Sequence, residues 1–218
     1  MEENKMPLIG DHAPEFHAMT TQGKIDFPAD YKGSWVVLFS HPADFTPVCT
    51  TEFIALSRMN ETFESLNAKL IGLSIDSLHS HLGWIKSIEA LNFNNEGKVK
   101  IPFPIIADIS MNVAKKYGML QTVANTQTVR AVFIIDPEGI IRTILYYPMS
   151  TGRNIPEIIR ILQSLQLNDK THYSTPANWQ PGDDVVMGAP LTIEEAQERL
   201  ESSDNTIKPL DWYLTMKK

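Results

Sequence analysis

Short apolar runs alternate with segments of helical periodicity along residues 35–166, and this alternation most restricts the possible fold. Short apolar runs bounded by turn residues are typical of buried strands, whereas apolar residues three or four positions apart are typical of helices. Strands and helices that alternate in this way build an α/β domain, with the strands side by side in one sheet. The sequence therefore predicts an α/β fold.

The expected strands are 35–40, 69–75, 103–107, 130–135 and 140–147. The turn sequence Asp136-Pro137-Glu138-Gly139 separates the last two, so we expect them to pair antiparallel and to make a mixed sheet. Helices are expected at 48–66, 78–91, 110–117 and 155–166. The order β-α-β-α-β-α-β-β-α is compatible with a thioredoxin-like fold, a central mixed β-sheet flanked by helices.

The composition changes after residue 167. Prolines and glycines interrupt residues 168–190, and Thr192 and Glu195 then form a capping box that opens a helix to about residue 202. We predict a thioredoxin-like domain at 1–167 and a C-terminal extension, or arm, at 168–218. The arm contains Trp179 and Trp212 but shows no core of its own, so we expect it to pack on its own domain or at a subunit interface.

Charge and cysteine content exclude several classes of function. The net charge of −7 opposes binding to nucleic acid or to an anionic membrane surface. The first residues, MEENKMPLIGD, lack an apolar signal segment, and no run of roughly 18 apolar residues occurs, so a cytoplasmic location is expected. A single cysteine supports no internal disulfide, structural zinc or iron–sulfur cluster. We expect no metal and no cofactor, and the partners left are small molecules and other proteins.

The single cysteine, Cys49, lies in the segment FSHPADFTPVCTTE at 39–52. Proline is favoured in the first turn of a helix, so Pro47 predicts that a helix begins near Thr46 or Pro47. Cys49 would then lie in the first turn, close to unpaired backbone N–H groups and the positive end of the helix dipole. Both favour a thiolate over a thiol.

Two charged residues are expected to accompany this cysteine. Arg130 leads directly into the apolar run AVFII, where an arginine is costly unless an anion meets it. A thiolate or a peroxide oxygen would serve as that anion, although the sequence alone does not establish the contact. Glu52 lies one helical turn after Cys49 and would repel a thiolate if unpaired, so we expect it to hold an arginine in a supporting role.

The spacing of Pro42, Thr46 and Cys49 resembles the active-site pattern of the peroxiredoxins. Further segments are similar to the one-cysteine, peroxiredoxin-six class of the alkyl hydroperoxide reductase and thiol-specific antioxidant superfamily: LSIDS (73–77), FPII (103–106), STGRN (150–154), SLQL (164–167) and TPANW (175–179). The resemblance covers nearly the whole chain, including the arm. It implies a thiol-dependent peroxidase that reduces hydrogen peroxide and organic hydroperoxides to water and alcohols.

The resemblance also assigns roles. Cys49 matches the peroxidatic cysteine, which passes through a sulfenic acid. Thr46 matches the hydroxyl that hydrogen-bonds sulfur and peroxide, and Pro42 matches the proline that shields the site from water. Arg130 matches the arginine that stabilises the thiolate and binds the substrate.

Two further residues and the partners follow from the same resemblance. His41 matches a histidine characteristic of the class, and Arg153 matches a second arginine near the pocket; both are expected to bind substrate. The segment 208–215 lacks the extra cysteines of archaeal relatives, so the cycle requires an external thiol such as thioredoxin, or glutaredoxin with glutathione. A homodimer or a ring of dimers is implied.

Three other interpretations remain open on the residues alone. Cys49 could be a buried structural thiol, or an oxidation sensor in a holdase-type chaperone. It could also be the nucleophile of a hydrolase with His41 as base. His79 and His81 are a weak metal candidate, because residues two apart on a helix face different ways and no third ligand lies nearby in the sequence.

Overall fold

A computed structural model of the chain describes residues 6–122 and 125–218. The chain forms two compact units, Met1–Ile155 and Pro156–Lys218. The division falls just after the first residue of helix α5 (Ile155–Thr171), whereas the composition places the boundary at 167/168. The composition changes only in the last turn of this helix, because most of α5 has an ordinary amphipathic sequence.

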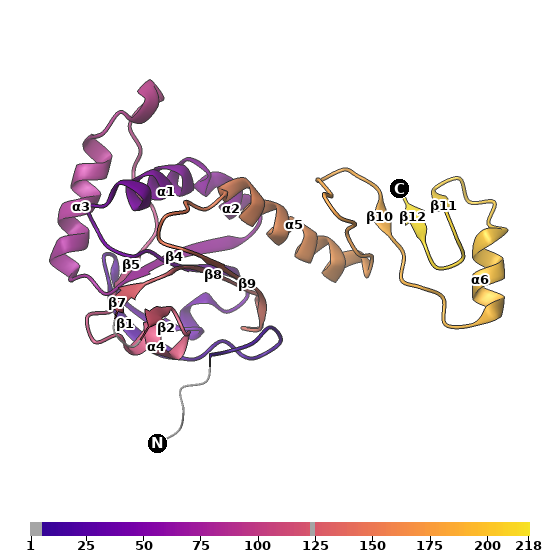
Figure 1. The fold of residues 1–218 in the computed structure, drawn as a ribbon, viewed down its shortest axis with the longest axis horizontal. Helices are drawn as coiled ribbons and strands as arrows, with labels where there is room; N and C mark the ends of the chain where they lie inside the picture. Colours follow the sequence, from indigo (N-terminus) through magenta and orange to yellow (C-terminus); the bar gives the residue numbers. More distant parts are fainter. Residues whose placement is uncertain (1–5, 123–124) are drawn as a thin grey trace, which may run out of the picture. The chain divides into compact units, whose positions relative to one another are not determined.

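The N-terminal unit is built on a seven-stranded sheet in the order β2-β1-β5-β4-β3-β8-β9 (Figure 1). β3 pairs parallel with β4 and antiparallel with β8, and β8 pairs antiparallel with β9, so the sheet is mixed as predicted. The strands of this unit are β1 Phe16–Thr20, β2 Gly23–Phe27, β3 Trp35–Ser40, β4 Ala68–Ser74, β5 Ile105–Ala107, β6 Leu120–Thr122, β7 Asn125–Thr128, β8 Arg130–Ile135 and β9 Ile141–Tyr147.

The apolar runs predict the central strands well and the peripheral ones poorly. The strand expected at 103–107 begins only at Ile105. The β1–β2 hairpin was not predicted, because its strands FHAMT and GKIDF mix apolar and polar residues instead of forming a continuous apolar run, and they are only partly buried. The separate pair β6–β7 was not predicted either.

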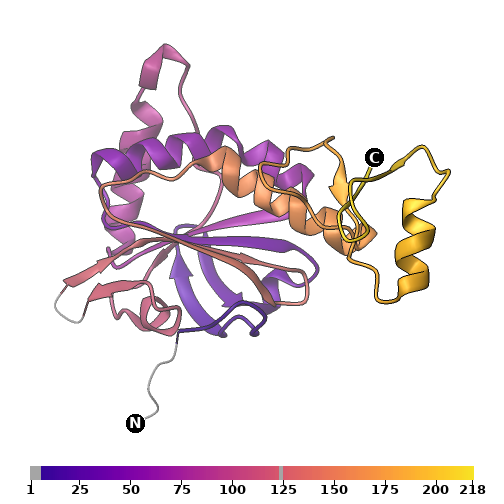
Figure 2. The same ribbon diagram turned by 45° about the vertical axis from the view of Figure 1, so that its right-hand side comes forward.

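Helices cover both faces of the sheet. Their bounds are α1 Pro47–Arg58, α2 Asn60–Ser65, α3 Leu78–Ala90 and α4 Asn112–Lys116, with short 3₁₀ turns at Ala29–Tyr31 and Phe93–Asn95. The helix expected at 48–66 is therefore two helices, since Met59 has non-helical dihedrals (φ −95°, ψ 3°). α1, α2 and α3 lie on one face and α4 on the other (Figure 2), as right-handed crossovers from β3 to β4 and from β4 to β5 require.

The core lies on both sides of β3, every residue of which is buried. Leu38 packs with Tyr117 on the α4 side, and Phe39 makes an edge-on contact with Phe53 of α1 on the opposite side. Burying one such side chain contributes about 1.5–3 kcal/mol. Packing on two sides holds the C-terminal end of β3, and the loop that leaves it, in a single position relative to α1.

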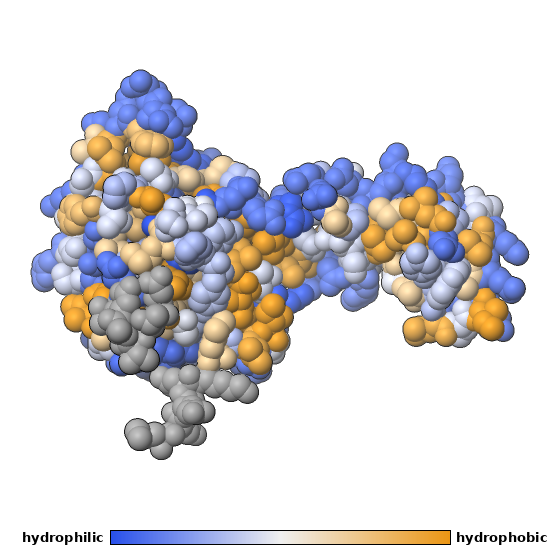
Figure 3. All heavy atoms as spheres, in the orientation of Figure 1, coloured by the Kyte–Doolittle hydropathy of each residue, from blue (hydrophilic) through white to orange (hydrophobic). Residues whose placement is uncertain are grey.

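The C-terminal unit contains α5, α6 (Ile193–Leu200) and a three-stranded antiparallel sheet of β10 (Val185–Val186), β12 (Thr215–Lys217) and β11 (Ile207–Pro209). Thr192 caps α6 as predicted, its hydroxyl accepting from the N–H of Glu195. Trp179 is buried, whereas Leu191, Ile193 and Trp212 expose much of their surface, and hydrophobic patches are visible on this unit in Figure 3. Among the described residues, no helix is long and apolar enough to cross a membrane.

Candidate active site

Cys49 is the third residue of α1 and is completely buried. Thr46 is the N-cap residue, with extended dihedrals, and Pro47 occupies the first helical position. The helix therefore begins where the proline predicts. The sulfur lies in the first turn, where backbone N–H groups have no partner within the helix and the helix dipole is positive.

The guanidinium of Arg130 reaches the sulfur. Its Nη1 lies 3.3 Å from Cys49 Sγ and 2.7 Å from Glu52 Oε2. Its Nε and Nη2 donate to the carbonyl oxygen of Met149 at 3.0 and 2.8 Å. Arg130 is the first residue of β8, which lies next to β3, the strand that leads into α1. These four hydrogen bonds fix the guanidinium plane beside Cys49. The contact with Cys49, which the sequence left open, is present.

Glu52 holds two arginines rather than one. Besides Arg130, it accepts from Arg153 Nε at 2.9 Å, from Arg153 Nη2 at 2.7 Å and from the Arg153 backbone N–H at 2.8 Å. Arg153 also donates from Nη1 to the carbonyl oxygens of Ser40 and Ala131. Burial raises the pKa of Glu52, but the ion pairs and hydrogen bonds from Arg153 and Arg130 outweigh burial and lower it. Glu52 is therefore ionised at neutral pH, as expected of a residue that supports arginine.

The charges of this cluster do not balance without the cysteine. Arg130, Arg153 and Glu52 are 3%, 7% and 3% exposed, respectively. Two positive charges and one negative charge leave a net charge of +1 away from water, which is costly unless an anion meets it. Among the described residues, a thiolate at Cys49, in contact with Arg130, would supply the missing negative charge. The arrangement favours a nucleophilic sulfur.

Thr46 and Pro42 lie in the loop between β3 and α1. Thr46 is half-buried, and its hydroxyl donates to the carbonyl oxygen of Ala43 at 2.8 Å. This hydrogen bond uses the donor and leaves the oxygen able to accept, so the expected bond to sulfur or peroxide stays a prediction. Pro42 is buried directly after His41. Its role in excluding water also stays a prediction.

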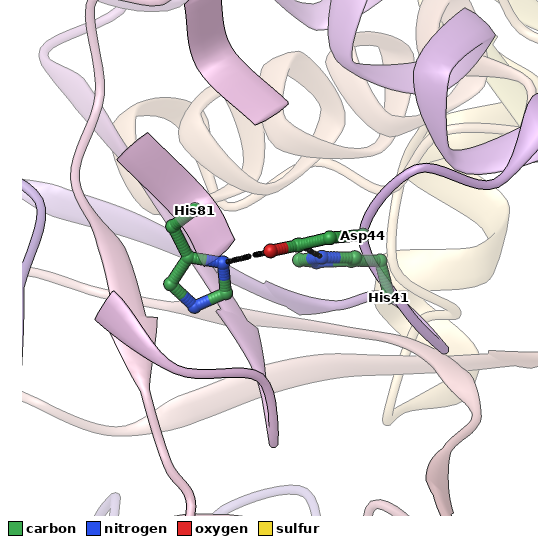
Figure 4. A group of neighbouring side chains, drawn as sticks. All are labelled: His41, Asp44 and His81. Carbon is green, nitrogen blue, oxygen red and sulfur yellow. Dashed lines mark hydrogen bonds and ion pairs between the residues drawn. The ribbon is translucent and has the colours of Figure 1, made fainter. Parts of the chain in front are cut away.

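His41 is buried just past the end of β3. It is joined by Asp44, which the sequence did not suggest, and by His81, which the sequence offered only as a weak metal candidate. Its Nε2 lies 2.9 Å from Asp44 Oδ1, and the same carboxylate lies 2.9 Å from Nδ1 of His81 in α3 (Figure 4). No third ligand-type residue lies near His81 in the sequence, but the fold brings Asp44 and His41 to it in space, whereas His79 is exposed and lies outside this group. No spacing signal relates positions 37 residues apart.

We expect Glu52→Gln to lower the free energy of unfolding by about 3–5 kcal/mol at pH 7, because it leaves two buried arginines without a carboxylate. Because the pKa of Glu52 is lowered in the folded state, this stabilisation is complete above the ordinary glutamate pKa and is lost as the pH falls through the folded value. Urea unfolding between pH 7 and pH 3 tests this. Glu89→Gln, at an ion pair with exposed Lys100, is the control and should cost less than about 1 kcal/mol. Equal losses at both positions would contradict the charge argument.

Comparison with known proteins places this geometry in a family. Residues 9–144 match the AhpC/TSA family, and residues 164–203 match the C-terminal domain of 1-Cys peroxiredoxin. A peroxiredoxin of Methanosarcina mazei is 58% identical over 98% of both chains, and peroxiredoxin 2 of Sulfurisphaera tokodaii is 50% identical over 100% of this chain and 99% of its own.

Solved structures agree with these relatives. A yeast mitochondrial 1-Cys peroxiredoxin, described with a thiol resolving mechanism via glutathione/thioredoxin systems, is similar at a TM-score of 0.85, with 41% identity over 98% of this chain and 100% of its own. A cysteine mutant of peroxiredoxin 6 of Arenicola marina is similar at a TM-score of 0.82, with 36% identity over 97% of this chain and 98% of its own. The two matched domains agree with the thioredoxin-like sheet and with a buried cysteine that contacts an arginine. This chain therefore belongs to the peroxiredoxin family and is a thiol peroxidase.

Proposed function

We propose that the protein reduces hydrogen peroxide and organic hydroperoxides through a sulfenic acid on Cys49, in a one-cysteine cycle completed by an external thiol. The observation that carries this proposal is the guanidinium of Arg130, held 3.3 Å from the sulfur within a buried cluster that lacks one negative charge. A peroxidase of this kind serves antioxidant defence and redox homeostasis.

The reaction begins with attack of the Cys49 thiolate on one peroxide oxygen. An S–O bond forms while the O–O bond breaks, and the other oxygen takes the electron pair and a proton to leave as water or an alcohol. Negative charge moves from sulfur to the leaving oxygen, and donors already aimed at the site stabilise it as it develops. Arg130 and the first-turn N–H groups of α1 are the proposed donors, with Thr46 and Arg153 assisting.

An external thiol is the proposed reductant, because the sequence contains no second cysteine. Thiol attack on the sulfenic acid yields water and a mixed disulfide, and a second thiol then releases Cys49. The solved yeast relative is described with glutathione and thioredoxin systems, so these are the first candidates here. A cycle that consumes thiols fits a reducing compartment, and we propose a cytoplasmic location.

We also propose that the arm, residues 168–218, packs against a second copy of the chain in a homodimer or a ring of dimers. Leu191 is 91% exposed, Ile193 74% and Leu210 69%. A single chain gains nothing by presenting such side chains to water, whereas a subunit interface would bury them. Light scattering of the full chain, compared with a Leu191→Ser/Ile193→Ser variant, tests this, and an identical monomeric mass for both would contradict it.

We expect hydrogen peroxide to convert Cys49 to a sulfenic acid within one turnover, faster than it oxidises free cysteine at the same pH. Stopped-flow mixing gives the rate, and dimedone trapping with mass spectrometry identifies the product. A rate equal to that of free thiol would contradict peroxidase function, whereas acylation of Cys49 by esters would indicate a hydrolase. Steady-state turnover with thioredoxin, or with glutaredoxin and glutathione, then identifies the reductant.

A further inference from the structure

A buried chain of hydrogen bonds links Asp44 to two histidines from different elements (Figure 4). Asp44 lies in the loop before α1, His41 directly follows β3, and His81 lies in α3. Asp44 Oδ1 is 2.9 Å from His41 Nε2, and Asp44 Oδ2 is 2.9 Å from His81 Nδ1. The two histidine side chains are 0% exposed and that of Asp44 is 1% exposed. Solvent water therefore cannot hydrate these charges, and they must be balanced within the group.

The partners of His81 determine its protons. Its Nε2 faces the carbonyl oxygen of Ile106 at 3.2 Å, and a carbonyl oxygen can only accept. Its Nδ1 faces the carboxylate of Asp44, which also only accepts while ionised. Burial raises the pKa of Asp44, but hydrogen bonds from the two histidines outweigh it and lower the pKa, so the carboxylate is ionised. Both nitrogens of His81 therefore face acceptors, an arrangement that favours hydrogen on both and a positive charge beside Asp44.

The protons of His41 follow from the same count. Its Nε2 donates to Asp44, and its Nδ1 is buried without a hydrogen-bond partner among the described residues. The pKa of His41 is lowered, mainly by burial, so the ring is neutral at pH 7. A neutral ring with hydrogen on Nε2 presents a bare, basic Nδ1. This atom is the unmatched acceptor of the group.

The distances are those of hydrogen bonds rather than of a metal site. Two atoms that each lie 2.0–2.1 Å from a tetrahedral zinc ion are roughly 3.3 Å apart. The nitrogen–oxygen distances at Asp44 are 2.9 Å, shorter than that separation and typical of a proton shared between the two atoms. The group is therefore a proton-bearing chain.

His41 lies on the same face of α1 as the reactive sulfur. Its ring centroid is 4.9 Å from that of Phe53 and 5.0 Å from that of Trp84. Phe53 is four residues after Cys49, and positions four apart share one face of a helix. Trp84 in turn donates to the hydroxyl of Thr50, the residue after Cys49. The imidazole therefore packs against α1 about one helical turn from Cys49.

The charged groups around the chain support the same proton count. Asp76, between β4 and α3, accepts from the backbone N–H of Asp44 at 3.0 Å and from the hydroxyl of Ser74 at 2.7 Å. Its negative charge favours a protonated histidine nearby. From α1, Phe53 faces His41, and from β5 the carbonyl oxygen of Ile106 faces His81. His81 is thus the ring with acceptors on both sides, whereas His41 has an acceptor only at Nε2 among the described residues.

We propose that His81 is a positioning residue for peroxide reduction. By carrying the proton that balances Asp44, it keeps His41 Nδ1 bare on the Cys49 side of α1, where this nitrogen accepts the O–H of the incoming peroxide. The inference rests on the proposed peroxidase function. In this proposal Asp44 and His81 act through His41, and neither of them touches the substrate.

Replacing His81 with glutamine tests the proposal, because glutamine is polar but carries no charge. Asp44 would then draw a proton onto His41, so that Nδ1 gains hydrogen and can no longer accept. We expect the second-order rate with hydrogen peroxide to fall about tenfold relative to the wild type at pH 6–7. The ratio of variant to wild-type rate should rise again as the pH increases and His41 loses this proton. His79→Gln, on the exposed side of α3, is the matched control and should leave both quantities unchanged.

A second substitution separates positioning from damage to the fold. Asp44→Asn removes the charge that draws the proton: the amide oxygen still accepts from His41 Nε2, and the amide N–H donates to residue 81. We therefore expect Asp44→Asn to restore the rate of His81→Gln in the double variant. Two results together would overturn the proposal. The His81→Gln rate would be lower than the wild-type rate by the same factor at every pH, and the Asp44→Asn substitution would not restore it.

Nitrogen-15 NMR of histidine-labelled protein gives a readout that does not depend on activity. We expect the wild-type signals of His41, assigned by comparison with His41→Asn, to show hydrogen on Nε2 and none on Nδ1, and those of His81 to show hydrogen on both nitrogens. A protonated His41 Nδ1 in the wild type would refute the proposal even if His81→Gln did not fold. A wild type with these NMR signals but without peroxidase activity would contradict only the proposed function.

Discussion

Cys49→Ser is expected to abolish peroxide reduction completely and to prevent any sulfenic acid from forming. A serine hydroxyl in this position is a far weaker nucleophile than a thiolate. Among the described residues, the side chain that contacts Cys49 is Arg130, which is not a base and cannot activate a serine. Stopped-flow mixing with hydrogen peroxide and dimedone trapping measure the two losses. Peroxide consumption above the buffer rate would show that another group carries the reaction.

The same position tests the charge balance of the cluster. Cys49→Ser leaves Arg130, Arg153 and Glu52 with a buried net charge of +1, whereas Cys49→Asp provides a negative charge at the position of the sulfur. We expect both variants to be inactive, with Cys49→Asp the more stable by about 1–3 kcal/mol in urea unfolding at pH 7, because a charged hydrogen bond to Arg130 is restored. A serine variant as stable as the aspartate variant would argue against a required anion.

Arg130→Met is expected to slow the reaction of Cys49 with hydrogen peroxide by about 10²–10³-fold, the usual effect of removing one donor that stabilises developing charge. Methionine keeps much of the volume but donates to neither Cys49, Glu52 nor Met149. The thiolate also loses its positive partner, so the pH profile of cysteine alkylation should move to higher pH. Rapid mixing with peroxide and alkylation by iodoacetamide measure the two effects.

Two further variants show whether charge or geometry matters at Arg130. Lysine keeps the positive charge but not the planar fork that reaches three acceptors at once, so Arg130→Lys should recover only part of the rate. Arg58→Met removes a half-buried arginine of the same helix α1, which pairs with Glu96, and should leave the rate unchanged. An alkylation profile of Arg130→Met identical to that of the wild type would remove Arg130 from the proposed role.

The central fold was predictable because its signals are local. β3, β4, β8 and β9 are apolar runs, and their strand bounds agree with the runs to within a residue. The β1–β2 hairpin was not predictable in the same way, because its strands lie at the edge of the sheet, carry polar residues and are held by pairing with each other and with β5. The break at Met59 was missed because apolar spacing continues through it from α1 into α2.

The candidate active site shows the same difference between local features, which the sequence predicts, and contacts between distant residues, which it does not. The sequence by itself determined the helix that carries Cys49 and the family: Pro47 begins α1, and the spacing of Pro42, Thr46 and Cys49 identifies the family. Only the tertiary structure decided which charged side chain meets the sulfur and which histidines meet at Asp44. Arg130 reaches Cys49 in α1 from β8, and His81 reaches Asp44 in the loop after β3 from α3. Sequence patterns describe neighbours along a helix or strand, whereas ion pairs and hydrogen bonds depend on distances that exist only after the sheet has assembled.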